Sequence, residues 1–304
     1  MNIEHLRKEK AIPKPPWLRV RLGGGPGYKR LHAILQARNL RTVCDEALCP
    51  NKGRCWENGR ATIMILGDVC SRRCAFCNVT PGKPAPCDAG EPRRVAEAVK
   101  AMGIHDVVIT SVTRDDLADG GAAIWAETLR RIREAVPAIL LEVLVPDFGG
   151  SPEALDRVLE ARPTILGHNL ETVSELYGKV RPQADYRRSL AVLSHAHRRG
   201  FTTKTGIMVG VGETAEQVHD TMSDALKAGC DILYIGQYLQ PSRKHLPVLR
   251  YVEPGEFDDY RQRGLKMGFK VVVSAPLVRS SYHSEEQAAY VATRGAGSSG
   301  FPKQ

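Results

Sequence analysis

The sequence predicts an α/β protein built on a parallel sheet, arranged as a partial (β/α)6 barrel with N-terminal and C-terminal extensions. Two observations lead to this prediction: seven short apolar runs recur along the chain, and stretches with helical periodicity separate most of them. Strands and helices that alternate in this way are typical of right-handed βαβ units. At 304 residues, 42% of them apolar, the chain can bury a sizeable core as one large or two small domains.

The seven apolar runs are predicted to be the strands of the sheet. They are short and rich in Val, Ile and Leu, which is typical of parallel strands that are covered on both faces. In chain order they lie at residues 61–67, 106–112, 138–145, 164–170, 202–210, 231–238 and 270–276.

Six further stretches are predicted to be helices, because their apolar residues recur every three or four positions. A loop that carries three cysteines separates the first of these helices from its strand. The predicted helices lie at residues 91–102, 122–136, 151–161, 185–200, 214–229 and 256–268.

Six such units and a closing strand are too few for an eight-fold barrel, so we expect an open, partial barrel over residues 61–276. A doubly wound sheet is the alternative. In both folds the functional loops lie at the carboxyl ends of the strands, and Cys70 follows the first strand by a few residues. Residues 1–60 are expected to form a basic arm and a cysteine segment, and residues 277–304 a C-terminal motif and a flexible tail.

The chain carries no stretch that we expect to enter a membrane. Its longest apolar runs, 138–146 and 271–278, are far shorter than the roughly 20 residues that cross a bilayer. The first 17 residues lack the apolar region of a signal peptide and contain acids that a transit peptide avoids. We therefore expect a cytoplasmic protein, in which clustered cysteines act as metal or cluster ligands rather than as disulfides.

The net charge of +9 is concentrated near the N-terminus. Residues 1–54 hold twelve Lys or Arg against four Asp or Glu, so the remaining 250 residues are nearly neutral. The arm from Lys8 through Arg41 is either a solvated tail or a docking surface for an acidic partner. A zinc-stabilised nucleic-acid-binding protein is one rival hypothesis, but no aromatic stacking run or recognised binding module accompanies the charge. We therefore expect no nucleic-acid partner.

Six of the eight cysteines form two triplets. Three thiolates on one short loop can hold three irons of a cubane cluster and leave the fourth iron open for chemistry. Structural zinc is the alternative, but zinc takes four ligands and typically uses two pairs. The downstream triplet, C-x₃-C-x₂-C, is Cys70, Cys74 and Cys77, and the upstream triplet, C-x₄-C-x₅-C, is Cys44, Cys49 and Cys55.

The downstream triplet resembles that of the radical S-adenosylmethionine enzymes. It follows the first strand of a predicted α/β barrel, and an aromatic residue, Phe76, precedes its last cysteine, as in that superfamily. With the upstream triplet, the chain is similar to the lipoyl synthase family in particular. Another sulfur-inserting radical enzyme, such as a relative of biotin synthase, is the rival. The likeness covers residues 37–283, through CPNKGRCW, ILGDVCSRRCAFCNV, TSVTRDDLADGGA, EVLVPDF, GHNLETV, GQYLQPSRKHLPV and VRSSYH.

The resemblance implies two 4Fe-4S clusters and S-adenosylmethionine as cofactors. The downstream cluster is expected to bind and cleave S-adenosylmethionine, giving a 5′-deoxyadenosyl radical. The upstream cluster is expected to donate sulfur to carbons 6 and 8 of a protein-bound octanoyl-lysine. The implied partners are octanoylated lipoyl-carrier domains (the glycine cleavage H protein or 2-oxoacid dehydrogenase acyltransferase subunits) and an electron donor such as ferredoxin or flavodoxin. The protein must then position the substrate and exclude side reactions, because the cofactor carries the difficult chemistry.

The resemblance also assigns roles to residues outside the cysteines. One serine of the RSSY motif is expected to be the fourth ligand of the upstream cluster, and the family's pattern favours Ser281 over Ser280. The stretch 206–213 resembles one that packs against adenine, with a plain strand and tight turn as the alternative. For Arg181 the alternative to pairing with the methionine carboxylate is a surface salt bridge. The residues expected to contact S-adenosylmethionine are Asn169, Glu171, Arg181, Gly206, Gly210 and Glu213.

Two adjacent carboxylates, Asp115 and Asp116, follow the second predicted strand. Such a pair could act as a general acid and base or bind magnesium. We prefer a structural and cofactor-positioning role, because abstraction of a hydrogen atom needs no titratable base at the carbon.

Overall fold

The computed structural model describes residues 12–20, 23–281 and 285–297, without the side chains of 285 and 294–297. Its centre is one eight-stranded sheet with the order β1-β2-β5-β6-β7-β8-β9-β10. All neighbours pair in parallel except β1, which is antiparallel to β2. The strands are β1 (Arg41–Thr42), β2 (Thr62–Ile65), β5 (Asp106–Ser111), β6 (Leu140–Leu144), β7 (Ile165–Gly167), β8 (Thr202–Val209), β9 (Ile232–Gln237) and β10 (Val271–Ser274).

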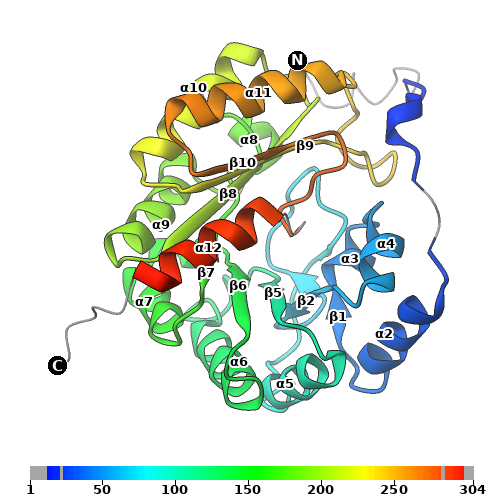
Figure 1. Cartoon of the computed structure of the whole chain (residues 1–304), viewed down its shortest axis with the longest axis vertical. Helices are drawn as coiled ribbons and strands as arrows, with labels where there is room; N and C mark the ends of the chain where they lie inside the picture. Colours follow the sequence, from blue (N-terminus) through cyan, green and yellow to red (C-terminus); the bar gives the residue numbers. More distant parts are fainter. Residues whose placement is uncertain (1–11, 21–22, 282–284, 298–304) are drawn as a thin grey trace.

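The main helices form an arc around the outside of the curved sheet (Figure 1). Because the seven parallel strands follow one another without a reversal of order, the fold is the expected partial barrel, and the doubly wound alternative is wrong. Within the described residues, no helix is long and apolar enough to span a bilayer. The outer helices are α5 (Glu91–Met102), α6 (Ala122–Ala135), α7 (Pro152–Glu160), α9 (Tyr186–Arg198), α10 (Ala215–Lys227) and α11 (Pro254–Met267).

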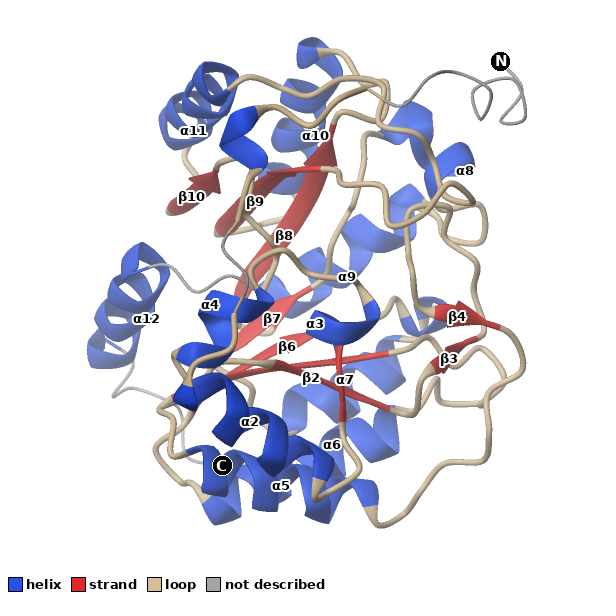
Figure 2. Ribbon diagram, turned by 90° about the vertical axis from the view of Figure 1, so that its right-hand side faces the viewer, coloured by secondary structure: helices blue, strands red, loops and turns tan. Residues whose placement is uncertain are grey.

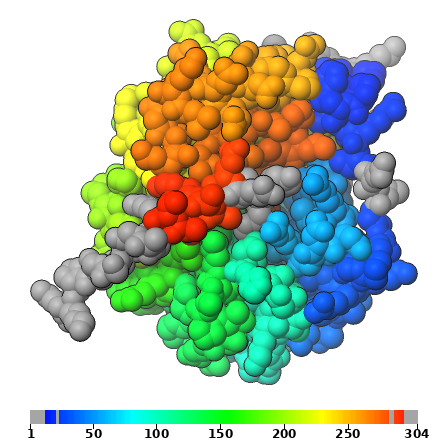
Figure 3. All heavy atoms as spheres, in the orientation of Figure 1, coloured from blue at the N-terminus to red at the C-terminus, as the bar shows by residue number. Residues whose placement is uncertain are grey.

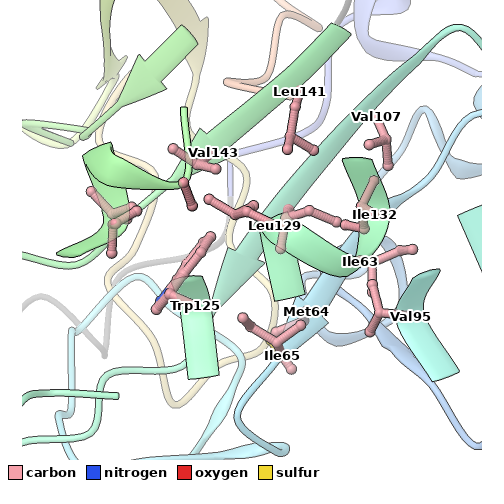
Figure 4. Packing of buried hydrophobic residues seen from close by; sticks show 14 of the residues in the cluster. Ile63, Met64, Ile65, Val95, Val107, Trp125, Leu129, Ile132, Leu141 and Val143 are labelled. Carbon is pink, nitrogen blue, oxygen red and sulfur yellow. The ribbon is translucent and has the colours of Figure 1, made fainter. Parts of the chain in front are cut away.

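The core between helices and sheet explains why these stretches are helical. On α6 the side chains of Trp125, Leu129 and Ile132 recur every three or four residues, so they share one face and are fully buried. They pack with Val95 of α5 onto Ile63 and neighbouring residues of β2, β5 and β6 (Figure 4). Burying each such side chain contributes about 1.5–3 kcal/mol. This packing fixes the first three parallel strands, whose ends carry the downstream cysteine loop and its supports.

The N-terminal extension packs directly on the segment that carries the upstream cysteines. A Cβ atom on Gly23 would lie 2.2 Å from the Cα atom of Gly53, so this close approach requires glycine. The carboxylate of Glu57 accepts hydrogen bonds of 3.2 Å from the backbone N–H groups of Gly27 and Tyr28 at the start of α2. The elements of this extension are η1 (Pro16–Leu18), α2 (Pro26–Gln36), α3 (Val43–Glu46) and α4 (Lys52–Glu57).

The C-terminal extension contains a helix, α12 (Glu285–Gly297). This helix was not among the helices expected from the sequence, and residues 298–304, which end the expected tail, lie outside the described residues. Figure 2 shows α12 at one end of the strands and the short strands β3 (Val69–Cys70) and β4 (Thr80–Pro81) at the other. The helix forms because its buried face carries Gln287 and two partly buried residues, Tyr290 and Val291, that pack against the sheet.

Candidate active site

The downstream triplet lies on a loop at the carboxyl end of β2, at the mouth of the barrel. The parallel pairing of β3 with β4 joins the two ends of this loop. Its middle is held by two other mouth loops, because Ala75 N–H donates to Val180 O at 2.9 Å and Ala75 O accepts from Leu246 N–H at 3.0 Å. Two side-chain contacts also hold the end of the loop. The imidazole Nε2 of His245 lies 3.0 Å from Cys77 O, and the amide Nδ2 of Asn78 donates to Glu46 O at 2.7 Å.

The cysteines of the downstream triplet are partly buried and have few polar partners. Burial raises the pKa of Cys74, against the opposing charge of Arg181, and raises the pKa of Cys77 to about 12. Backbone N–H groups donate to Cys70 Sγ from Thr113, at 3.3 Å, and from Arg72. Metal ligation requires thiolates, and such partly buried thiols become thiolates when a cation replaces their protons. The donor set therefore fits a group of iron ions.

Arg72, between the first two cysteines of this loop, ties the loop to the ends of β5 and β6. Its guanidinium donates to Asp115 at 2.8 and 2.7 Å and to Asp147 at 2.9 and 2.6 Å. Burial would raise the pKa of Asp147, but hydrogen bonds and charge from Arg72 lower it to about 2. Asp116 instead pairs with Arg114 at 2.8 Å. Both carboxylates of the predicted pair thus have arginine partners, which agrees with a structural role.

Four residues expected to contact S-adenosylmethionine lie together: Asn169 and Glu171 follow β7, Gly206 lies within β8, and Arg181 follows the short helix α8 (Tyr177–Val180). Asn169 Nδ2 donates to Glu171 Oε1 at 2.9 Å, and Arg181 Nη1 donates to Asn169 O at 2.8 Å. A Cβ atom on Gly206 would lie 3.1 Å from Asn169 Oδ1. Glu171 has a left-handed backbone (φ 68°), a strained conformation that clusters at functional sites. Burial raises the pKa of its carboxyl group, against the charge of Arg181.

This group of residues has polar atoms left over for a ligand. Among the described residues, the buried Nε of Arg181 has no hydrogen-bond partner. Arg181 has no carboxylate within 4.0 Å in the described part of the chain, so the surface salt bridge is not formed there. Its charge and that of Glu171 both act on Cys74. A zwitterionic ligand beside the downstream triplet fits this pair of opposite charges.

The other two residues of the predicted set, Gly210 and Glu213, form the turn after β8. Glu213 accepts hydrogen bonds from the backbone N–H groups of Gly210 at 2.6 Å and Val211 at 3.0 Å. Both carboxylate oxygens therefore shape the turn. Gly210 has φ 99°, and a Cβ atom there would lie 2.4 Å from Arg250 O. The turn thus needs glycine for its conformation and for close approach.

The upstream triplet lines a cavity that the C-terminal motif also reaches. Asn51, between the second and third cysteines, donates to Leu277 O at 2.7 Å and so joins two segments 226 residues apart. Ser281 lines the cavity. Ser280 instead points toward β8, where its Cβ lies 3.6 Å from the position of a Cβ on Gly206. The residues lining the cavity include Cys44, Cys49, Asn51, Lys52, Arg54, Cys55, Arg60, Asp106, Arg279 and Ser281.

The electrostatics of this cavity also fit a group of iron ions. Burial raises the pKa of Cys44 to about 11 and raises that of Cys55, and the charge of Cys49 adds to both shifts. Burial lowers the pKa of Arg279, and the thiol of Cys49 opposes that shift. Within the described residues, no three His, Cys, Asp or Glu side chains converge on the position of a single ion. The three upstream cysteines and Ser281 line one cavity, so together they could hold a larger group.

Sequence reasoning missed several residues that organise these two sites. Arg72 and Asn51 could have been noticed as polar residues inside the cysteine loops. Their partners could not, because Asp147, which pairs with Arg72, and Leu277, which pairs with Asn51, are distant in sequence. His168 had no signal of its own. Its Nδ1 lies 2.8 Å from Val145 O, its buried Nε2 has no partner among the described residues, and burial lowers its pKa to about 4.

Comparison with known proteins defines the class first. The model of the Radical SAM superfamily matches residues 64–225, which include the downstream cysteine loop and the strands through β8. The solved structure of a methylornithine synthase has a TM-score of 0.53 and 17% identity, covering 93% of this chain and 91% of that chain. This likeness concerns the fold alone. The superfamily, the barrel and the loop together define a radical S-adenosylmethionine enzyme, which uses S-adenosylmethionine and a 4Fe-4S cluster.

Curated relatives then identify the family. The lipoyl synthase of Rubrobacter xylanophilus is 53% identical over 276 residues, covering 90% of this chain and 86% of the relative. The lipoyl synthase of Parabacteroides distasonis is 50% identical over 283 residues, covering 93% of this chain and 99% of the relative. The chain belongs to the lipoyl synthase family.

Proposed function

We propose that this member of the lipoyl synthase family divides its reaction between the two cysteine triplets. The reaction inserts two sulfur atoms at carbons 6 and 8 of a protein-bound octanoyl-lysine. The downstream triplet, Cys70, Cys74 and Cys77, holds the cluster at which S-adenosylmethionine is cleaved. The upstream triplet holds a second 4Fe-4S cluster, whose sulfide is consumed as the sulfur substrate. When bound, the downstream group supplies the electron that generates a 5′-deoxyadenosyl radical.

One observation carries the assignment of the upstream site: a cavity is lined by one buried and two partly buried cysteines and by Ser281 from the other end of the chain. Three thiolates leave one iron of a cubane cluster without a protein ligand. We propose that the Ser281 oxygen fills that position. Ser280 lies toward β8 instead, which supports the choice of Ser281.

We propose that Asn169, Glu171 and Arg181 bind the amino acid end of S-adenosylmethionine. The opposite charges of Glu171 and Arg181 beside Cys74 support this proposal. We further propose that the stretch 206–213 packs against adenine, with Gly206 and Gly210 allowing the close approach of Asn169 and Arg250 that shapes this stretch. Glu213 supports this turn through its hydrogen bonds to the backbone. Together these residues orient the ligand, which fixes where hydrogen abstraction takes place.

The family acts on lipoyl-carrier substrates, and we propose that the basic arm docks an acidic carrier, such as the glycine cleavage H protein or a 2-oxoacid dehydrogenase acyltransferase subunit. Lys14 and Arg19 are exposed, whereas Lys8, Lys10 and Arg21 lie outside the described residues. The chain that follows these residues packs on α4, beside the upstream cavity. We further propose ferredoxin or flavodoxin as the reductant and a cytoplasmic location.

The test separates the triplets by mutation. Replacing the downstream cysteines with alanine is expected to abolish deoxyadenosine formation. The upstream triple variant is expected to form deoxyadenosine but no dithiolane. Both are assayed anaerobically with an octanoyl-lysyl peptide, and iron and sulfide are measured in each protein. Dithiolane formation by the upstream variant would rule out the proposed sulfur donor, and zinc without sulfide in the parent protein would rule out both clusters.

A further inference from the structure

A glutamine of α12 is buried in a charged network at the amino-terminal end of the barrel. Gln287 is 1% exposed. Its Oε1 accepts hydrogen bonds from Lys204 Nζ at 2.8 Å and from Tyr234 OH at 2.6 Å. Its Nε2 donates to Glu142 Oε2 at 2.7 Å. Three strands, β6, β8 and β9, are thus joined to α12 through one side chain.

The network needs this amide because it contains a buried ion pair. Lys204 Nζ lies 2.8 Å from Glu142 Oε1, and both side chains are 2% exposed. Such a pair is costly to bury unless its remaining hydrogen-bonding groups are also satisfied. An amide accepts from the ammonium group and donates to the carboxylate at the same time. Gln287 therefore completes a network that the strands alone leave incomplete.

Apolar and peripheral contacts hold α12 in the same place. Its residues Tyr290 and Val291 pack against a separate cluster of buried residues that includes Ile165 and Ile232, the first residues of β7 and β9. Tyr290 OH lies 3.1 Å from Asp231 Oδ1. The space-filling view shows α12 (red) between the orange segment that contains α11 and the green segment that contains α6 (Figure 3). The helix is therefore integrated into the barrel rather than appended to it.

The position of α12 bears on the upstream cavity through the chain that precedes it. Ser281 lies four residues before the first residue of the helix. On its other side Val278 is buried, and its N–H donates to Ala275 O at 3.0 Å. The segment 279–281, which supplies Ser281 to the cavity, thus lies between buried Val278 and the docked helix α12.

We infer that Gln287 is a positioning residue for the upstream site: by docking α12 it holds Ser281 in the cavity of the three thiols. This inference rests on the proposed function, in which Ser281 is a ligand of the upstream cluster. Gln287 itself is not one of the described residues that line the cavity. Its role is to fix the second end of the segment that carries the ligand.

The test compares Gln287→Leu with Glu286→Gln on the exposed side of the same helix. Glu286 pairs with Arg261 at 2.8 Å at the surface, so this variant is a matched control. In the apoprotein, hydrogen exchange of the amides of 279–281 is expected to speed up in Q287L and to stay unchanged in E286Q. In the reconstituted protein, Q287L is expected to form deoxyadenosine normally. Its dithiolane per deoxyadenosine should fall about tenfold to a hundredfold, as for other small misplacements of a reacting group.

The outcomes separate this inference from the proposed function. If Ser281→Ala leaves the ratio of dithiolane to deoxyadenosine unchanged, the ligand assignment itself is wrong. If Ser281→Ala lowers the ratio but Q287L changes neither the ratio nor the exchange of 279–281, the positioning role is wrong. An equal loss of both products with a lower Tm would show a purely structural role and overturn the inference. Should Q287L not fold, Tyr290→Phe removes the hydrogen bond to Asp231 and is judged by the same exchange measurement.

Discussion

The strongest energetic prediction concerns Arg72, whose replacement by methionine removes the cation that joins the downstream cysteine loop to β5 and β6. The Asp147 side chain is 0% exposed, whereas that of Asp115 is 39% exposed. Loss of one partner from a buried ion pair costs about 3–5 kcal/mol. Asp147 keeps a hydrogen bond from Gly149 N–H at 3.1 Å and a contact with Arg188 at 3.5 Å. We therefore expect the lower end of that range, about 3 kcal/mol.

The assay is urea unfolding of the apoprotein at pH 7, combined with a double-mutant cycle. The cycle uses Arg72→Met, Asp147→Asn and the double variant, whose coupling free energy isolates the pair. Arg93→Met is the matched control, because its partner Glu97 is 46% exposed and Arg93 itself is 64% exposed. This exposed pair is expected to cost about 0.5 kcal/mol or less. Equal costs for R72M and R93M, or a coupling free energy near zero, would refute the reasoning.

Three further predictions test the sites separately. Ser281→Cys is expected to retain the upstream cluster, measured as iron and sulfide, but to slow dithiolane formation, because a thiolate releases iron less readily than an oxygen ligand. Ser280→Cys should slow dithiolane formation less. If Ser280→Cys had the larger effect, Ser280 rather than Ser281 would be the ligand. His168 is neutral in the folded state because burial lowers its pKa to about 4, so stability is lost as the pH falls from its ordinary value of 6.5 toward 4. At each pH the free energy of unfolding in urea is measured for the parent and for His168→Gln, and the value of the variant is subtracted from that of the parent. This difference should fall by about 3 kcal/mol between pH 7 and pH 4. A difference that does not change with pH would contradict a buried neutral imidazole. Charge reversal at Lys14 and Arg19 should lower kcat/KM for an intact acidic carrier at low salt but not for a short octanoyl peptide, and equal effects on both substrates would exclude docking.

The sequence was sufficient for the barrel because each barrel element carries a local signal. Its strands are continuous apolar runs, and its outer helices repeat apolar residues every three or four positions, so burial and periodicity coincide. The helix α12 was not predicted from the sequence, because the glycines and serines at the end of the chain favour a flexible tail. Its docking depends on Gln287 meeting a buried ion pair formed by Lys204 and Glu142, which periodicity does not reveal.

The candidate sites were predictable to a different extent. The cysteine triplets have recognisable spacing, and the resemblance supplied the roles that we propose for Ser281 and for Arg181. The partners of Arg72 could not be predicted, because Asp147 is 75 residues away and meets it only when β6 lies beside β5. Spacing likewise gave no indication that both oxygens of Glu213 are occupied by backbone N–H groups. Tertiary contacts, rather than local sequence, decide such roles.

The hydrogen bond between Asn51 and Leu277 has a consequence for the order in which the two sites can be completed during synthesis. The downstream loop has its ionic supports once β6 has emerged from the ribosome, about halfway along the chain. The upstream cavity, in contrast, receives Ser281 only after nearly every residue has been translated. Closing so long a loop is entropically unfavourable until the intervening barrel has folded. The three upstream thiols of a nascent chain therefore lack their serine for most of its synthesis, and they gain it only when the barrel is whole.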